Sequence, residues 1–280
     1  MPVDCWTLSG RIFRMADFLA GMATSSRTRA DAAGSFRDGD FDRPVVPLSL
    51  AGFGVIAEIK QRSPAEGALA SADSDRVGRA QTYAAAGATA ISVLTEPERF
   101  DGALAHLDEV AAACPGTPVM RKDFLVDPVQ VLEARRAGAS GVLLIAAMLD
   151  DAALRRMLDV SFEHGMFVLL ESFDEDDLQR SRALVEPYAD DVDSGRLLFG
   201  VNTRNLRTLE VDPDRLERLA PMLPSGFNVA ESGLKTAADA GRTAGWGYRL
   251  ALVGTALMRS DDPAALIAGM RSAGSEALAA

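Results

Sequence analysis

Cysteine and histidine are scarce in this chain of 280 residues, which contains only Cys5, Cys114, His106 and His164. Two cysteines cannot make the disulfide framework of a small secreted domain, so we expect a protein of the reducing cytoplasm. A structural zinc site needs cysteine and histidine ligands in a recognisable spacing, and the sequence has no such cluster. We therefore expect a chain without a bound metal.

Excess positive charge and long apolar runs are also missing. The 29 lysines and arginines are outnumbered by 40 aspartates and glutamates, which gives a formal net charge of −11. That balance argues against binding to nucleic acid, which requires a basic surface. No stretch approaches the roughly 18 apolar residues of a membrane span, and the first residues lack the pattern of a secretion signal. We expect neither a nucleic-acid nor a membrane partner.

Lysine is the rarest charged residue in the chain. Arginine supplies almost every cation, and only Lys60, Lys122 and Lys235 are lysines. A lysine ammonium can give up its proton under conditions in which an arginine guanidinium cannot. Because Lys60 and Lys122 each end a run of strand-forming residues, we interpret them as functional groups. The plainer alternative is that each lysine merely pairs with a carboxylate.

Length and composition fit one large domain. With 48% hydrophobic and 25% charged residues, the chain is typical of a globular protein with a substantial core. Residues 1–50 are predicted to form an extension that covers one end of a domain spanning residues 51–280. Within the extension, residues 12–23 have the pattern of an amphipathic helix, whereas residues 25–29 and 34–47 look polar, broken and mobile.

Short apolar runs alternate with helical patterns from residue 54 onward. The eight expected strands are 54–60, 90–95, 117–122, 141–145, 167–171, 197–202, 226–231 and 250–253. The expected helices are 75–86, 104–113, 128–137, 150–164, 174–184, 212–222, 236–244 and 263–271. Gly87 and Gly138 each follow a helix, where a glycine readily takes the left-handed conformation that ends it.

The alternation of strands and helices also predicts the topology. Strands joined through helices pair in parallel by right-handed crossovers. Eight such units predict closure into a single (βα)8 TIM barrel, an α/β fold typically of about 250 residues, here with a helical N-terminal extension. An open, doubly wound sheet is the alternative, but the glycine-rich dinucleotide fingerprint is missing after the first strand.

Polar side chains recur where the expected strands end. In such a barrel the C-terminal strand ends converge on one mouth, where the active site lies. Ionisable, amide and hydroxyl groups at six of these ends are better explained by a catalytic pocket than by isolated ion pairs. In strand order the groups are Glu58 and Lys60, Lys122, Glu171, Asn202, Glu231 with Ser232, and Thr255.

The last two strand ends carry small residues ahead of helices. Ser232, Gly233, Gly254 and Thr255 offer backbone N–H groups and two hydroxyls. Loops after the seventh and eighth strands bind phosphate in many barrels of this kind, because helix N-termini favour anions. We therefore predict that this end of the site binds a phosphate monoester. The alternative is that the glycines serve only to make turns.

The charged residues suit acid–base chemistry, in which one group donates a proton and another accepts one. If Lys60 and Lys122 face each other, each should disfavour the charge of the other, which would ease proton donation. A lysine that forms a Schiff base with a carbonyl substrate is also compatible with these residues. The sequence has neither a cluster of metal-binding carboxylates nor a nucleophile elbow.

Several short motifs follow one another between residues 53 and 260. They are 55–64 (VIAEIKQRSP), 121–124 (RKDF) with Gln130 and 133–135 (EAR), 138–139 (GA), 143–145 (LLI), 200–206 (GVNTRNL), 210–212 (EVD), 231–233 (ESG) and 253–258 (VGTALM). In this order they resemble the motifs of the indole-3-glycerol phosphate synthase family. They are specific as a set, whereas a short piece such as ESG says little alone.

The resemblance implies a lyase of tryptophan biosynthesis that needs no cofactor. The family closes the ring of 1-(2-carboxyphenylamino)-1-deoxyribulose 5-phosphate, with loss of carbon dioxide and water, to form indole-3-glycerol phosphate. A small phosphosugar is therefore the expected substrate. We expect a monomer, with other enzymes of the same pathway as candidate partners.

By the same resemblance, each polar group acquires an expected role. Lys122 is expected to be the general acid that protonates the ribulose carbonyl, and Glu171 the base of the dehydration. Lys60 is expected to hold the substrate carboxylate and to share in proton donation. The other expectations are orientation of lysines and substrate hydroxyls by Glu58, Asn202 and Glu231, carboxylate binding by Ser63 and Arg204, ring packing by Phe124 and Leu143, and phosphate binding by Ser232, Gly233, Gly254 and Thr255.

The sequence departs from the family pattern at several positions. Ala65 stands where a serine is usual, Ala103 stands where Gly-Ser is common, and Ser172 with Phe173 replaces a frequent Val-His pair. None of these positions carries an expected catalytic role. An enzyme that performs the same chemistry on a substituted anthranilate derivative therefore stays open as an alternative.

Two further alternatives are less well supported. A phosphosugar isomerase of the same pathway would work with a cysteine and an aspartate, and neither cysteine here lies at a plausible site. A non-catalytic barrel that binds other proteins would have no use for Lys60, Lys122 and Glu171 together at its strand ends.

Overall fold

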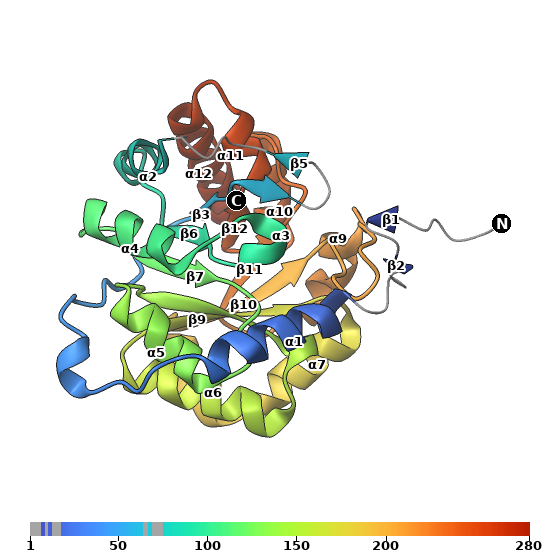
Figure 1. Ribbon diagram of the computed structural model, residues 1–280. Coiled ribbons are helices and arrows are strands. Elements are labelled where there is room, and N and C mark those ends of the chain that lie inside the picture. The colour runs from blue at the N-terminus through green and yellow to red at the C-terminus, as the bar shows by residue number, and fades with distance from the viewer. Residues whose placement is uncertain (1–6, 9–10, 13–17, 64–66, 69–74) are drawn as a thin grey trace.

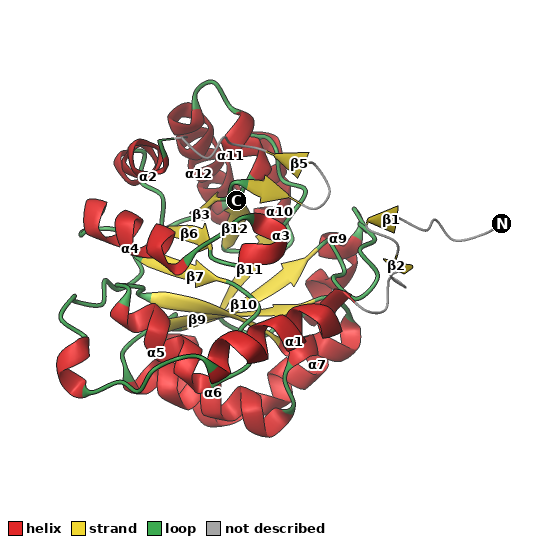
Figure 2. Cartoon of the chain, viewed as in Figure 1, coloured by secondary structure: helices red, strands yellow, loops and turns green. Residues whose placement is uncertain are grey.

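The structure is a closed barrel of eight parallel strands surrounded by helices, as the sequence predicts (Figures 1 and 2). This computed structural model describes residues 7–8, 11–12, 18–63, 67–68 and 75–280. Consecutive barrel strands pair in parallel, and the last closes on the first. The strands are β3 (Gly54–Ile59), β6 (Ala90–Leu94), β7 (Val119–Lys122), β8 (Gly141–Ile145), β9 (Phe167–Ser172), β10 (Leu197–Asn202), β11 (Phe227–Glu231) and β12 (Leu250–Val253).

Helices connect the barrel strands along its outer side (Figure 2). Several begin at a side chain that accepts a hydrogen bond from a backbone N–H of the first turn, as Asp75, Asp150 and Thr236 do. Gly87 and Gly138 have φ values of +81° and +87°, as expected of glycines that end helices. The main helices are α2 (Arg76–Ala85), α4 (Leu104–Ala113), α5 (Pro128–Arg136), α6 (Asp151–Glu163), α7 (Glu175–Leu184), α9 (Arg215–Leu219), α10 (Ala237–Gly245) and α12 (Pro263–Ala279).

Two expected helices differ from those observed. The helix expected over residues 212–222 is split into α9 and a 3-10 turn, η5 (Ala220–Met222), because Pro221 cannot donate the hydrogen bond that would continue it. The last helix runs beyond residue 271, because its buried side continues through Gly274 and packs on α10.

Short elements lie in the loops and were not expected. Three of them are short helices, of which one follows β6, one precedes β10 and one follows β12. The short elements are β4 (Arg62–Ser63), which pairs with β5 (Gly67–Ala68), α3 (Pro97–Phe100), α8 (Ala189–Asp193), α11 (Thr255–Arg259), and the 3-10 turns η2 (Asp38–Asp40), η3 (Ala146–Met148) and η4 (Glu186–Tyr188).

Alternation along the strands divides the core into two parts. Side chains on the outward faces, such as Val55, Val93 and Val142, pack against the helices. The inward-facing side chains form a second apolar cluster that fills the barrel. Its strand residues are Ile56, Ala90, Met120, Leu143, Ile145, Phe167, Leu169, Leu198, Val229, Leu250 and Leu252.

The N-terminal helix α1 spans Phe18–Asp31, so the expectation of a helix over residues 12–23 is wrong at both ends. Ile12 lies in the two-residue strand β2 (Arg11–Ile12), which pairs with β1 (Thr7–Leu8), and residues 13–17 lie outside the described part. Leu19 and Met22 of α1 pack on the inner apolar cluster.

Residues 25–29 are helical, although their polar sequence predicted a broken segment. Tertiary contacts explain the difference. Ser26 is fully buried, and its hydroxyl and carbonyl oxygens accept hydrogen bonds from the side-chain amide of Gln130 at 2.9 and 3.2 Å. Residues 34–47 are mostly irregular, as expected, with η2 as one short turn.

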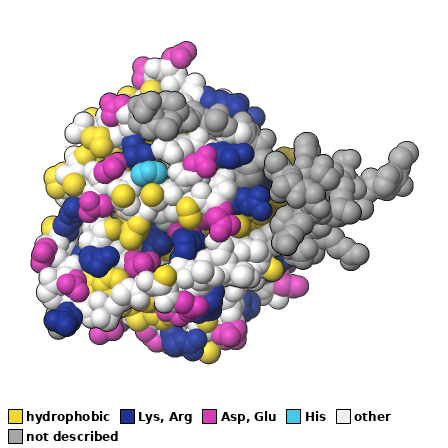
Figure 3. Space-filling model, in the orientation of Figure 1, with side chains coloured by type: hydrophobic (Ala, Val, Ile, Leu, Met, Phe, Trp, Pro, Cys, Tyr) yellow, Lys and Arg dark blue, Asp and Glu magenta, His cyan; other side chains and the backbone are white. Residues whose placement is uncertain are grey.

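The surface carries charges of both signs. On the face in Figure 3, acidic and basic side chains are interspersed among other residues. None of the described helices combines the length and the apolar character that crossing a membrane requires. Cys114 is a buried free thiol, and Cys5 lies outside the described residues.

Two glycines of α12 give a test of the packing. A Cβ at Gly274 would collide with the buried ring of Phe53, whereas a Cβ at Gly269 would lie 3.6 Å from the Cβ of Ala237, an ordinary contact. Gly274→Ala should lower the free energy of unfolding by about 1–3 kcal/mol. Gly269→Ala should raise it by up to about 1 kcal/mol, because alanine favours a helix. Urea denaturation measures both, and equal effects would contradict this packing.

Candidate active site

Four charged side chains from alternate strands form one layer at the C-terminal end of the barrel interior. They are Glu58 on β3, Lys122 on β7, Glu171 on β9 and Glu231 on β11. Barrels of this type fill their interiors with layers of four side chains from alternate strands. The three carboxylates are at most 3% exposed. Here the uppermost layer is ionic, whereas the layers beneath it are apolar.

The ammonium of Lys122 lies among the three carboxylates. It donates a hydrogen bond to Glu231 Oε2 at 3.2 Å, and it lies 3.7 Å from Glu171 Oε2 and 4.0 Å from Glu58 Oε2. Burial acts to lower the pKa of Lys122, but the charges of Glu231, Glu171 and Glu58 outweigh burial and raise that pKa above its ordinary value. Lys122 therefore carries its proton at neutral pH.

Lys60 and Lys122 are bridged by Glu58. Lys60 Nζ lies 2.6 Å from Glu58 Oε1, while the other oxygen of Glu58 faces Lys122. Burial acts to raise the pKa of Glu58, but the two ammonium groups outweigh it and lower that pKa. We expected Lys60 to disfavour the positive charge on Lys122. This expectation is wrong, because the three carboxylates around Lys122 raise its pKa.

Asn202 links this ionic layer to the loops after β10 and β11. Its Nδ2 donates to Glu171 Oε2 at 3.1 Å, and its Oδ1 accepts from Ser232 Oγ at 2.8 Å and from the backbone N–H of Arg204 at 2.9 Å. Ser232 and Gly233 both have positive φ, +66° and +83°. The left-handed backbone at Ser232 is unfavourable for a residue with a Cβ, and the bond to Asn202 helps to hold it.

Glu171 and Glu231 each keep one oxygen available. Their Oε1 atoms are buried and have no hydrogen-bond partner among the described residues. Burial, and then the neighbouring Glu171 carboxylate, raise the pKa of Glu231 well above its ordinary value, and Lys122 offsets this only in part. Glu231 therefore holds a proton more tightly than an ordinary glutamate. Within the described residues, no group of His, Cys, Asp or Glu side chains could hold a metal ion.

Two glycines make room for the carboxylates. A Cβ on Gly200 of β10 would overlap Glu231 Oε1, and one on Gly254 would overlap Glu58 Oε1 and lie 2.9 Å from Lys60 Nζ. Sequence reasoning assigned Gly254 only to phosphate and missed Gly200. The alternation of faces along a strand could have identified Gly200. It lies two residues before Asn202 and therefore faces the same way, into the barrel.

An apolar wall stands beside the ionic layer. Phe124 and Leu143, expected to pack on a substrate ring, are 4% and 3% exposed and belong to the inner cluster. The Phe124 ring meets Phe18 of α1 edge-on at 5.9 Å and lies 6.1 Å from the ring of Phe100. Phe18 and Phe100 were not anticipated, because the local sequence does not show that either ring meets Phe124.

The other expected binding residues lie around the mouth. Ser63 is in β4, but its side chain, like Ala65, lies outside what the structure describes. The half-buried Arg204 directs Nη1 to the Leu209 carbonyl at 3.4 Å. Thr255 is the first residue of α11, directly after Gly254. Of these residues, Arg204 is linked to the ionic layer indirectly, because its backbone N–H donates to Asn202, which in turn donates to Glu171.

Of the two departures from the family pattern after β9, Ser172 faces away from the ionic layer, whereas Phe173 belongs to the inner apolar cluster. Ser172 is buried on the outer side of β9, with its hydroxyl 3.3 Å from that of Ser181 on α7. Phe173 is fully buried, and the guanidinium of Arg207 lies 5.7 Å from the centre of its ring. Ala103 is the N-cap residue of α4.

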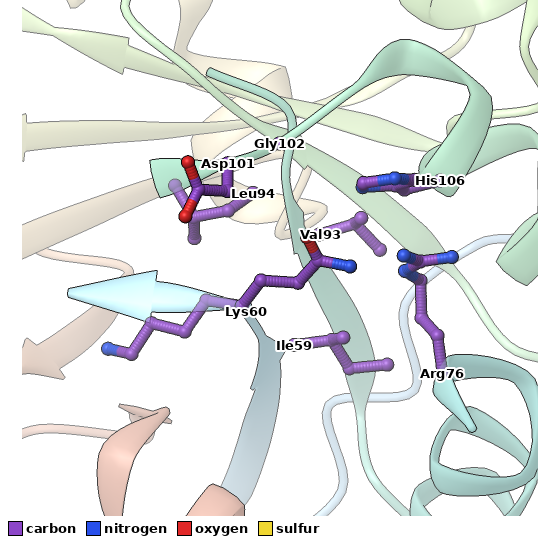
Figure 4. A pocket seen from close by; sticks show the side chains of 9 residues that line it. Ile59, Lys60, Arg76, Val93, Leu94, Asp101, Gly102 and His106 are labelled. Atoms are coloured by element: carbon purple, nitrogen blue, oxygen red, sulfur yellow. The ribbon is translucent and has the colours of Figure 1, made fainter. Parts of the chain in front are cut away.

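A small pocket lies beside the layer, between β3, β6 and α4 (Figure 4). The stem of Lys60 lines it, but in Figure 4 the Lys60 ammonium points away from Arg76 and His106. The Gln61 amide fills part of this space, since its nitrogen can donate to the Asp101 carbonyl at 2.8 Å and its oxygen can accept from Arg76 at 2.6 Å. The residues that line this pocket therefore surround the aliphatic part of Lys60 rather than the charged layer.

Comparison with known proteins decides the family. The family model described as indole-3-glycerol phosphate synthase matches residues 44–270. The chain belongs to the indole-3-glycerol phosphate synthase family. A synthase of that name from Nocardioides sp. is 46% identical over 241 residues, which cover 85% of this chain and 88% of the relative. One from Mycobacterium leprae is 43% identical over 260 residues, which cover 92% and 91%.

Solved structures with distant sequences share the barrel. A 3-hexulose-6-phosphate synthase from Salmonella typhimurium aligns with a TM-score of 0.58 at 16% identity, over 81% of this chain and 98% of that one. The tryptophan synthase α subunit from Legionella pneumophila aligns with a TM-score of 0.55 at 15% identity, over 80% and 93%. At such identities these likenesses concern the fold alone.

The raised pKa of Glu231 gives a test of the site that needs no substrate. Its pKa lies well above 4.5 in the folded protein and near 4.5 in an unfolded chain. The folded state therefore binds more protons once the pH exceeds 4.5, and this group should lower stability as the pH rises further. The slope contributed is at most about 1.4 kcal/mol per pH unit.

Urea denaturation between mildly acidic and neutral pH measures this slope. The free energy of unfolding of Glu231→Gln should fall less steeply with rising pH than that of the wild type, because glutamine does not titrate. Glu217→Gln, on the exposed side of α9, is the matched control and should keep the wild-type slope. Identical slopes in wild type and Glu231→Gln would show that Glu231 titrates normally.

Proposed function

We propose that this protein is an indole-3-glycerol phosphate synthase, a carboxy-lyase. It would convert 1-(2-carboxyphenylamino)-1-deoxyribulose 5-phosphate into indole-3-glycerol phosphate, carbon dioxide and water. The observation that carries the proposal is the protonated Lys122, held among three buried carboxylates at the barrel mouth. Membership of the family supports the same reaction.

Ring closure requires an acid. The aromatic carbon that bears the carboxylate attacks the ribulose carbonyl carbon, and the carbonyl oxygen gains negative charge as the new carbon–carbon bond forms. We assign Lys122 as the donor that delivers a proton to this oxygen and leaves a hydroxyl. The carboxylates around Lys122 keep it protonated until the substrate oxygen, by then basic, takes the proton.

Two losses complete the reaction. The bond to the carboxylate breaks, carbon dioxide departs, and the electron pair restores the aromatic ring. The new hydroxyl then leaves as water, while a base removes a proton from the carbon beside the nitrogen. We assign this base to Glu171, whose Oε1 has no protein partner in the described residues, and the donor to the departing hydroxyl to Lys60.

Substrate binding falls to the residues around the layer. Lys60, Ser63 and Arg204 are proposed to hold the carboxylate, and Phe124 and Leu143 to pack against the aromatic ring. The phosphate would then lie across the barrel from Phe124 and Leu143, at the strands between β10 and β3. We assign it to backbone N–H groups and hydroxyls of Ser232, Gly233, Gly254 and Thr255, which lie at the ends of the adjacent strands β11 and β12.

A fluorescence assay tests the activity. Purified protein mixed with the carboxyphenylamino-deoxyribulose phosphate should produce indole fluorescence, and mass spectrometry should show the loss of one carbon dioxide and one water per substrate. A folded protein that leaves the substrate unchanged would refute the proposal.

Substitution of Lys122 tests the general acid. Lys122→Met should lower kcat by at least about 10²-fold, the lower range for removal of a positioned proton donor. Lys122→Arg should be nearly as damaging, because guanidinium is a poor acid. Lys235→Met, which removes the exposed third lysine, is the control and should keep wild-type kcat. Full activity in Lys122→Met would disprove the assignment.

Substitution of Thr255 tests the phosphate site. A hydrogen bond to a charged group is worth about 1.5–3 kcal/mol, so Thr255→Ala should raise KM by about 10- to 100-fold. The change in kcat should be smaller, because the phosphate is bound alike in the ground and transition states. Ser260→Ala, just past the other end of α11, is the control. A loss confined to kcat would remove Thr255 from the phosphate site.

A further inference from the structure

The helix α1 is bound to the segment that follows the catalytic strand β7. Arg29 on α1 makes two hydrogen bonds to Asp123, from Nη1 to Oδ2 at 2.8 Å and from Nη2 to Oδ1 at 2.9 Å. Asp123 immediately follows Lys122 in the chain. A residue of the N-terminal extension thus contacts the position next to the proposed general acid.

Asp123 fixes the end of β7 from the outer side of the strand. It is 1% exposed. Besides Arg29, it accepts hydrogen bonds from Thr95 Oγ1 at 2.7 Å, from Arg121 Nη2 at 3.2 Å and from the backbone N–H of Phe124 at 2.8 Å. Because side chains alternate along a strand, Lys122 points inward where Asp123 points outward. Movement of Asp123 would therefore move Lys122.

Arg29 also balances a buried charge. Burial acts to raise the pKa of Asp123, but the hydrogen bond from Arg29 and the charges of Arg121 and Arg29 outweigh it and lower that pKa to about 2. Asp123 is thus ionised at neutral pH. A buried ion that loses one partner is strongly unfavourable, so the segment would rearrange if Arg29 were absent.

The other ion pair of α1 differs in kind. Arg27 pairs with Asp127 at 3.1 Å, but their side chains are 53% and 38% exposed, against 25% and 0% for Arg29 and Asp123. Exposed ion pairs of this sort contribute little to the stability of the folded state. Ser26 binds α5 through Gln130 and has no bond to Asp123. The structure therefore offers separate substitutions for docking of α1 and for the contact to Asp123.

We propose that Arg29 is a positioning residue, which through Asp123 sets the place of the Lys122 ammonium among its carboxylates. This inference rests on the proposed role of Lys122 as general acid. It makes the N-terminal helix part of the machinery that prepares the acid, in addition to covering the barrel mouth.

Steady-state kinetics of Arg29→Gln tests the inference. A displacement of about 1 Å can cost about 10²-fold in rate, so kcat should fall by about 10- to 100-fold. KM should rise by a smaller factor than kcat falls, because the proposed carboxylate and phosphate contacts are untouched and only Phe124, among the proposed substrate contacts, is bonded to Asp123. Arg29→Lys keeps the positive charge but loses the paired hydrogen-bond donors. Its kcat should therefore lie between that of the wild type and that of Arg29→Gln. Arg27→Gln and Ser26→Ala should retain wild-type kcat.

The pH profile separates positioning from a merely structural role. If Lys122 moves away from its carboxylates, its pKa falls, and the alkaline limb of kcat should shift to lower pH in Arg29→Gln. Loss of folded protein would instead lower the amplitude at every pH. In the background of Asp123→Asn, Arg29→Gln should cause little further loss of kcat, since both act through one contact.

Defined outcomes would overturn the inference. Wild-type kcat and an unshifted profile in Arg29→Gln would do so, as would equal losses in Ser26→Ala. Should Arg29→Gln fail to fold, Arg29→Lys takes its place, and unchanged kcat there would count against the inference. If the wild type shows no turnover, the proposed function fails. NMR titration of the Lys122 ammonium then tests positioning alone, and an identical titration in Arg29→Gln would refute it.

Discussion

The interaction on which the site depends is the ion cluster at the C-terminal end of the barrel. Three buried carboxylates and two partly buried ammonium groups lie there, and isolated charges in such a place would be prohibitively unfavourable. Each finds opposite charge nearby, with Glu58 between the two lysines and Lys122 among all three glutamates. The excess of carboxylates keeps Lys122 protonated and raises the proton affinity of Glu231.

The surrounding structure accommodates this cluster. Gly200 and Gly254 lack the side chains that would occupy the space of Glu231 and Glu58. Asn202 ties Glu171 to the loop that begins with Ser232. A second ion pair, Arg29 with Asp123, lies on the outer side of β7 and connects the N-terminal helix to the same strand end. The acid–base groups are therefore held from inside and outside the barrel.

Much of the site could be predicted from the sequence, because the period of a strand tells which residues share a face. Lys60 and Glu58 lie two apart, and scarcity singled out Lys60 and Lys122 among the cations. The prediction that the two lysines disfavour each other's charge was wrong. The alternation of residues along a strand does not show that Glu58 lies between them. The helical residues 25–29 were missed because their local sequence favours a broken segment, whereas burial of Ser26 stabilises a helix.

The sequence by itself determined the alternation of strands and helices, the inward direction of the charged residues and the family to which they point. These are local properties, encoded within a few residues. Tertiary structure decided which charges became neighbours, and hence the raised pKa values of Lys122 and Glu231. It also decided the docking of α1, because Arg29 and Asp123 are 94 residues apart in the chain and meet only when the barrel has closed.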